Sequence, residues 1–399
     1  MREAYNKDAL SGVLGAAMAG FTGPFVMVIA RDKLHTSATL LGLMTAAPFL
    51  GNLFAMVWAN AMEGKNKVPF VVWSTLAARG VFFLILFATT SATFATVIIV
   101  SSLLTTVASP AYAAVMKEIY PNRIRGRAMS YCRVCVVTVS VLCVLVAGRL
   151  LEYVSYTYVF PVAALVGVGS SLVFGRIRTA EPLAVEKRPT HQFLLDTIKI
   201  LRDDKPFRWF ALSIFTVGFG NLIVVPLYAI FQVDCLHIKT WQVSWLTTAS
   251  SVVAVFGFFY WGAYIDKNTP LKAAAASVLL FTATPLTYAI ASTWPNIIPA
   301  SNMWLVLLPA AAIQGIAGAG IELSYFNSIL RFSTPERVSH YQAVFTSLLG
   351  VRGTIAPLVG AALVQHKIAG MQSLFFLSAA LCLVSVALQV HGTRTHSVR

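Results

Sequence analysis

The chain has 399 residues, of which 57% are hydrophobic and 11% are charged, and its mean hydropathy is +0.74. An average soluble domain is about one quarter charged, so this composition excludes a soluble globular enzyme. The formal net charge of +15 would suit a nucleic-acid-binding protein. The basic residues, however, lie in short loops between apolar runs and form no separate basic domain, so we expect no nucleic-acid binding.

Apolar runs recur along the whole chain, and about 20 apolar residues are enough to cross a bilayer. Six runs lie at 9–30, 38–62, 68–90, 92–116, 128–150 and 154–175. Six more lie at 207–231, 241–265, 270–292, 303–330, 340–365 and 370–390. The sequence therefore predicts an all-α polytopic membrane protein whose twelve transmembrane helices form two pseudo-symmetric six-helix bundles, 1–175 and 207–399.

A polar linker, 176–206, separates the two predicted bundles. Within it Leu194, Ile198 and Leu201 recur at helical spacing, which predicts a short amphipathic helix on the membrane surface. The basic residues indicate the orientation, because 22 of the 30 Lys and Arg lie on the side of both termini and five lie on the other. Since Lys and Arg are retained in the cytoplasm, we expect cytoplasmic termini and a plasma or inner membrane location.

The two halves repeat each other, which indicates an internal duplication of the chain. Gly20 in the first span aligns with Gly218 in the seventh. The second span aligns with the eighth through Thr45, Ala46, Trp58, Ala59 and Glu63, opposite Thr248, Ala249, Trp261, Gly262 and Asp266. The loop after the fourth span aligns with that after the tenth through Pro121, Arg123 and Ile124, opposite Pro335, Arg337 and Val338.

These motifs resemble the major facilitator superfamily of secondary transporters over nearly the whole chain. The family carries a GxxxD(R/K) loop after the second and eighth spans, and Gly262, Asp266 and Lys267 match it. Ala59 and Glu63 form a degraded first copy. The family's PxxRG(R)A-like loop is present as Pro121, Arg125, Gly126, Arg127 and Ala128. The resemblance implies two bundles that rock around a cavity lined by the glycine-rich first and tenth spans.

Charged residues at the helix ends are candidates for a gate, since a carboxylate there can hold helix N-termini or arginines. The charged candidates are Glu63, Asp266, Lys267, Arg125 and Arg337, and Gly262 belongs to the same motif. The alternative is that these residues serve only topology and solubility. Two family patterns are absent, an arginine in the fourth span and a glycine-proline motif in the fifth, which weighs against drug–proton antiport.

Four charged residues lie inside spans, where each costs at least about 2.5 kcal/mol. They are Arg79, Arg133, Glu322 and Arg352. We expect Arg352 to face the cavity and Arg79 to pair within its bundle, while Arg133 either reaches the headgroups or has a functional role. Glu322 is either a proton carrier or a fixed ionised partner of Arg352 or Arg133, and the sequence leaves both open.

Three cations against one carboxylate favour a solute with an anionic group. Polar partners on the same spans are Asn221, Gln314 and Asn327. The sequence thus predicts a monomeric secondary transporter that moves a small organic solute by alternating access, coupled to protons, in contact with membrane lipid and without a cofactor. A multidrug efflux antiporter and a non-transporting scaffold or sensor remain alternatives. We interpret Cys132 and Cys135, a CxxC pair inside a span, as packing residues rather than metal ligands.

Overall fold

The computed structural model describes residues 2–54, 58, 61–62, 65–120, 125–179, 199–291, 302, 304–333 and 337–396. These residues form helices and no strand. Among them, 11 helices are long and apolar enough to cross a membrane. The shorter helix α3 (Ala38–Leu53) has 16 residues and covers the first part of the remaining predicted span, 38–62. The all-α polytopic fold is therefore confirmed.

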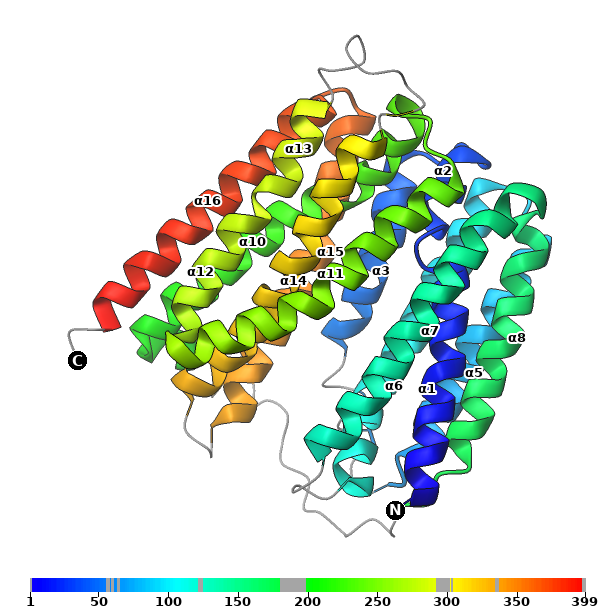
Figure 1. Cartoon of the computed structure of the whole chain (residues 1–399), viewed down its shortest axis with the longest axis horizontal. Coiled ribbons are helices and arrows are strands. Elements are labelled where there is room, and N and C mark those ends of the chain that lie inside the picture. The colour runs from blue at the N-terminus through cyan, green and yellow to red at the C-terminus, as the bar shows by residue number, and fades with distance from the viewer. Residues whose placement is uncertain are drawn as a thin grey trace. The chain divides into compact units, whose positions relative to one another are not determined.

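The chain divides into two compact units (Figure 1). Unit 1 comprises Met1–Thr36, Leu50–Lys187 and Lys239–Ser244. Its helices are α1 (Arg2–Thr22), α2 (Val26–Asp32), α5 (Val68–Phe83), the 3₁₀ turn η1 (Leu84–Phe87), α6 (Ser91–Ile119), α7 (Arg125–Tyr153) and α8 (Tyr156–Gly175).

Unit 2 comprises Ser37–Phe49, Arg188–Ile238 and Trp245–Arg399, and so contains most of α3. Its other helices are α10 (Lys205–Ile230), the π-turn η2 (Phe231–Cys235), most of α11 (Thr240–Lys267), α12 (Pro270–Phe281), α13 (Ala283–Ala291), α14 (Trp304–Phe332), α15 (Val338–Gln365) and α16 (Met371–His396). Residues 180–198, most of the predicted linker, lie outside the described residues.

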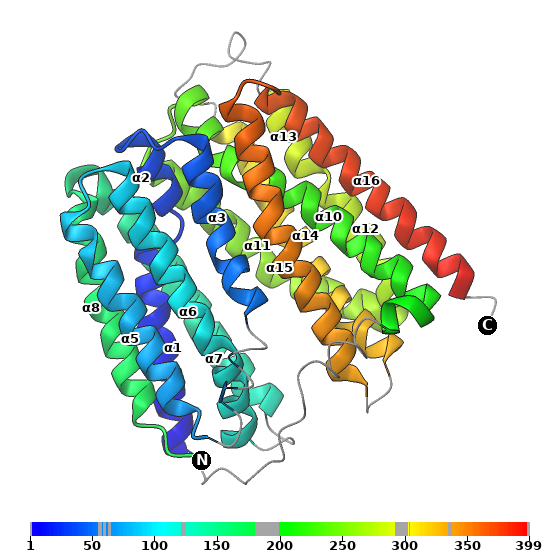
Figure 2. The ribbon, with the colours of Figure 1, turned by 180° about the vertical axis from the view of Figure 1, so that it is seen from behind.

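The helix pairing within unit 1 is repeated within unit 2. In unit 1, α1 packs against α7 and α8, and α5 packs against α6 and α8. In unit 2, α10 packs against α15 and α16, and α12 packs against α14 and α16 (Figure 2). The pairs correspond one to one when α1 is matched with α10, as the alignment of Gly20 with Gly218 requires. The duplication seen in the sequence is thus a duplication of packing.

Local sequence signals explain where several helices begin. Thr90 accepts a hydrogen bond from the Thr93 amide, and the Thr93 hydroxyl accepts one from the Thr90 amide, both at 3.2 Å, which forms a capping box for α6. Ser155 caps α8 and Thr269 caps α12 in the same way through a single side-chain oxygen. Pro24 lies in the break between α1 and α2. Pro48, Pro226 and Pro309 lie inside continuous helices.

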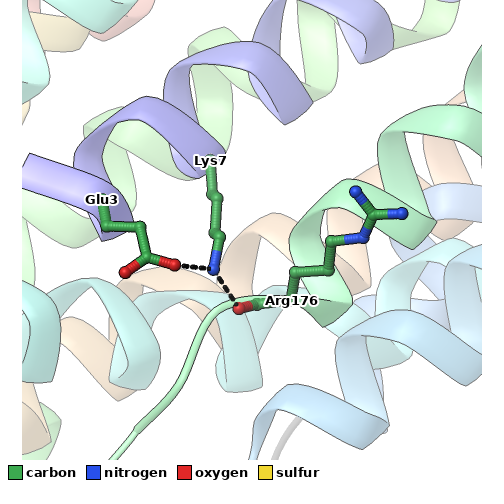
Figure 3. Close-up of polar contacts among 3 residues, drawn as sticks. All are labelled: Glu3, Lys7 and Arg176. Carbon is green, nitrogen blue, oxygen red and sulfur yellow. Dashed lines mark hydrogen bonds and ion pairs between the residues drawn. The ribbon is translucent and has the colours of Figure 1, made fainter.

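A lysine ties the start of α1 to the end of α8 (Figure 3). The ammonium group of Lys7 donates to the carboxylate of Glu3 at 2.5 Å and to the backbone carbonyl of Arg176 at 2.8 Å. Arg176 is the C-cap residue of α8. A cation at this position meets the partial negative charge of a helix C-terminus, so the contact stabilises this end of unit 1.

Candidate functional site

Unit 2 contains a cavity of about 470 Å³ between α10, α11, α12, α14 and α15. This volume falls in the range of small-molecule sites. Four residues singled out in the sequence line it together, namely Asn221, Gln314, Glu322 and Arg352. Ser250, Ser251 and Tyr325 add further polar groups to the described lining. Phe258 and Phe281 add apolar aromatic rings.

Small residues in α14 set the shape of the cavity. A Cβ atom added at Gly315 would lie 2.9 Å from the carbonyl carbon of Ser250, so α11 and α14 approach closely there. Three residues further along α14, Gly318 has no heavy atom within 4 Å of the same position. A side chain at Gly318 would therefore occupy part of the cavity. The predicted role of the tenth span as a cavity wall agrees with this arrangement.

Arg352 is the buried cation of the cavity, with 6% of its surface exposed. One guanidinium nitrogen donates to the backbone carbonyl of Ile214, and the group lies flat against Gly218, where any side chain would collide with it. The guanidinium Nε is buried and forms no hydrogen bond with the described residues. Burying a cation costs several kcal/mol unless its donors find partners, so the unused donor marks a place where an anionic group would be stabilised.

The equivalent helix pair in unit 1 shows that packing alone does not need this arginine. There Gly20 of α1 meets α7 directly, and an added Cβ atom would lie 2.7 Å from the Ser140 carbonyl oxygen and 2.8 Å from the Cys143 Cβ. In unit 2 the Arg352 side chain lies against Gly218 in the corresponding contact between α10 and α15. The duplicated glycine thus packs against the neighbouring helix α7 in unit 1 and against the guanidinium of Arg352 in unit 2.

Arg79, by contrast, is fully engaged by its own unit. Its guanidinium donates to the Gly167 carbonyl and the Ser171 hydroxyl of α8, and a third bond reaches the Ser170 hydroxyl at 3.4 Å. Thr75 joins the same network through Ser171 at 2.6 Å. This arrangement agrees with the expectation that Arg79 pairs within its bundle, and it links α5 to α8.

The other polar groups of the cavity differ in exposure. The side chains of Glu322 and Gln314 are exposed, while Tyr325, one turn after Glu322 on α14, is buried. Gln389 of α16 lies behind the cavity and donates to the Tyr325 hydroxyl at 3.4 Å. The Tyr325 ring packs edge-on against Phe210 with 5.7 Å between centroids. The cavity therefore has a rigid aromatic back wall and an exposed carboxylate.

Two further candidates do not line this cavity. Asn327 donates to the Leu323 carbonyl of its own helix at 2.8 Å, and Arg133 is an exposed residue of α7 in unit 1. Of the gate candidates, Asp266 and Lys267 are exposed at the end of α11, and Gly262 is half-buried one turn before them. Arg337 is exposed at the N-cap of α15. Arg125 is the first residue of α7, and its side chain is not among the described parts of the structure. Glu63 lies outside the described residues.

Sequence reasoning missed a buried carboxylate in unit 1. Asp8 is 6% exposed and accepts hydrogen bonds from Tyr120 at 2.7 Å and from Tyr112 at 3.4 Å. Burial, together with the hydrogen bond to Asp8, raises the pKa of the Tyr120 phenol, so this group stays a donor. The spacing of Asp8, Ser11 and Gly15 could have indicated that Asp8 is buried. These residues fall on one face of α1, and that face packs on other helices.

It also missed two serines of the cavity wall, Ser250 and Ser251. A serine inside an apolar helix carries almost no hydropathy signal, because its hydroxyl can bond back to its own backbone. Within the described part of the chain, no group of three or more His, Cys, Asp or Glu side chains is placed to hold a metal ion.

The family model described as Major Facilitator Superfamily matches residues 9–292 and 233–395. The chain belongs to this superfamily. It is therefore a multi-pass integral membrane transporter of small-molecule solutes rather than an enzyme, and the family works by secondary transport. A comparison with curated protein sequences finds no relative.

Solved structures of superfamily transporters share the fold over almost the whole chain. A bacterial homologue of the human lysosomal transporter Spinster, inward-facing and unoccupied, has 15% identity and a TM-score of 0.68, with 98% of this chain and 97% of that chain covered. The nucleoside transporter NupG has 12% identity and a TM-score of 0.75, with 98% and 99% covered. A bacterial homologue of the iron transporter ferroportin, inward-facing, has 12% identity and a TM-score of 0.72, with the same coverage.

Proposed function

We propose that this transporter moves a small organic solute with an anionic group across the plasma or inner membrane, coupled to protons. It acts as a monomer whose two bundles, 1–175 and 207–399, expose the cavity of unit 2 to each side in turn. Both termini lie in the cytoplasm, as the distribution of basic residues favours. The exposed charges at Asp266, Lys267 and Arg337 belong to its gate.

The observation that carries the anionic assignment is the buried guanidinium of Arg352 with its unused Nε donor. An anionic group at the cavity wall would supply the missing partner, and a charge-assisted hydrogen bond in a site shielded from water is among the strong ones. A metal ion as solute is disfavoured, because a cation would meet Arg352 and the described residues group no metal ligands. Glu322 is the carboxylate of the cavity that takes up the coupling proton.

The test is proton flux into proteoliposomes, recorded with a trapped pH dye while organic anions, neutral sugars and lipophilic cations are added in turn. We expect a response to anions that Arg352→Met reduces at least about tenfold, the loss of one charge-assisted hydrogen bond. Methionine keeps the volume of the side chain and removes a buried charge, so the variant should fold at wild-type stability or better.

Arg79→Met is the matched control, since it also removes a buried arginine from an apolar helix. Its partners on α8 lose their donor, so we expect lower thermal stability with the anion response retained. A response to lipophilic cations would instead identify an efflux antiporter. Silence across the panel, or an anion response unchanged in Arg352→Met, contradicts the proposal.

A further inference from the structure

We propose that the solute is a zwitterion of about amino-acid size, whose ammonium group binds Glu322 while its carboxylate binds Arg352. This inference rests on the proposed function, in which Arg352 holds the anionic group. It adds the second charge of the solute and the residue that recognises it.

The charge balance of the cavity is the first argument. The excess of cations inside the spans favoured an anion, yet two of the three arginines do not line the cavity. Arg79 is bonded to α8, and Arg133 is an exposed residue of unit 1. Among the residues that the structure describes, the charged lining therefore consists of one arginine, Arg352, and one carboxylate, Glu322. A wall with one charge of each sign is complementary to a solute with one charge of each sign.

The cost of a simple anion is the second argument. A monoanion bound at Arg352 would share a cavity of about 470 Å³ with the Glu322 carboxylate. Two negative charges within one small, partly buried cavity repel each other. That repulsion is removed if Glu322 carries a proton, and it becomes an attraction if the solute brings an ammonium group. The proton and the ammonium group are then alternative occupants of one carboxylate, so binding of the zwitterion displaces the proton into the cavity water.

The placement of the two side chains is the third argument. They come from different helices, Glu322 from α14 and Arg352 from α15, and both line the same cavity. The volume of the cavity equals that of a sphere about 10 Å across. Arg352 is buried in the wall, while Glu322 is exposed. Phe258 and Phe281 supply apolar surface in the same lining. An amino acid with an apolar side chain would use all of these features.

Two matched sets of probes separate the charges of the solute from its body. The first set is phenylalanine, 3-phenylpropionate and 2-phenylethylamine, and the second is leucine, 4-methylpentanoate and 3-methylbutylamine. Within each set the apolar body is kept, and the solute is a zwitterion, an anion or a cation. Binding to the purified transporter in detergent is measured by titration, with thermal stabilisation as a second readout.

We expect the zwitterion of at least one set to bind about tenfold or more tightly than its anion, the gain from one added charge-assisted contact. Glu322→Gln should remove this preference by weakening the zwitterion and strengthening the anion. Because Glu322 is exposed, the isosteric change should leave folding intact. Glu152→Gln, which alters an exposed carboxylate of α7 outside the cavity, should leave the preference unchanged.

The two proposals fail in different ways. An anion that binds as tightly as its zwitterion, in a manner that still needs Arg352, overturns the zwitterion and leaves the proposed function standing. A zwitterion preference that survives Glu322→Gln overturns the role of Glu322. If no probe of either set binds, the zwitterion proposal is wrong, and the proposed function is decided by the anion panel. If Arg352→Met binds the probes as the wild type does, both proposals are wrong.

Discussion

Single residues in this transporter are best understood through the partners they lack or possess. Arg79 and Arg352 are both arginines inside apolar helices, and hydropathy treats them alike. Three polar groups of α8 surround Arg79, whereas Arg352 keeps a buried Nε without a bond among the described residues. A satisfied arginine stabilises helix packing, and an unsatisfied one at a cavity wall is available to a ligand. The sequence predicted which charges lie inside spans, but partner count depends on helix contacts that are distant in sequence.

The carboxylate of Asp8 offers a sharp test at this scale. Tyr120→Phe removes its short hydrogen bond and leaves a buried acceptor with only the 3.4 Å contact to Tyr112. We expect the free energy of unfolding to fall by about 1–3 kcal/mol, the usual cost of an unsatisfied buried polar group. The measurement is the denaturation midpoint of the protein in detergent, which should be lower. Tyr112→Phe is the control and should cost less, because its bond is long and weak. Equal effects of the two changes would contradict a special role for Tyr120.

At the scale of helices, hydropathy located the long apolar helices of the described residues and misplaced some of their ends. The first span was predicted to begin at residue 9, and the helix begins at Arg2, because Asp8 is buried through hydrogen bonds that a hydropathy sum does not count. The seventh was predicted from residue 207 and begins at Lys205, since Asp204 caps it through the Phe207 amide at 3.0 Å. Caps and buried polar pairs fix helix ends, and both depend on individual atoms rather than on average hydrophobicity.

The two halves secure the starts of their first helices with the same chemistry. In unit 1 the carboxylate of Asp8 accepts from Tyr120, and in unit 2 the carboxylate of Asp204 accepts from Tyr341, both at 2.7 Å. The tyrosines stand on helices that do not correspond in the duplication, at the end of α6 and near the start of α15. The sequence alignment of the halves therefore could not reveal this shared contact.

The end of α11 carries a prediction about the gate. Asp266→Asn removes an exposed carboxylate of the family motif, and we expect turnover in proteoliposomes to fall about threefold to tenfold, the effect of one lost charge contact on a barrier. Affinity for the solute should stay within about twofold, because Asp266 does not line the cavity. Asp203→Asn, another exposed carboxylate, serves as control. Normal turnover in Asp266→Asn would make Asp266 a residue of topology alone.

For the whole molecule, duplication supplies the architecture and divergence supplies the site. The repeated helix pairs give both units the same framework, while the cavity with Arg352 and Glu322 belongs to unit 2. The sequence predicted this framework, because the repeat and the family motifs can be recognised from residue identities and their spacing. It placed Asn221, Gln314, Glu322 and Arg352 on helices that line the cavity, and it predicted that Arg79 pairs within its bundle. It nevertheless counted all three arginines in the charge of the cavity, because the contacts of Arg79 with α8 join helices that are distant in sequence.

Alternating access of the cavity can be tested at Gly318. No heavy atom lies within 4 Å of a Cβ atom added there or at Gly80, an exposed glycine of α5 outside the cavity. In a background without the five native cysteines, Gly318→Cys should react with a membrane-impermeant thiol reagent added to whole cells and also to inverted vesicles, because the cavity opens to each side in turn. Gly80→Cys is the control, and a residue away from the cavity should not become reactive from both sides. Since a bound solute fills the space around Gly318, the solute that proves to be transported should slow the reaction from either side. Reaction of Gly318→Cys from one side only, with and without solute, would contradict alternating access through this cavity.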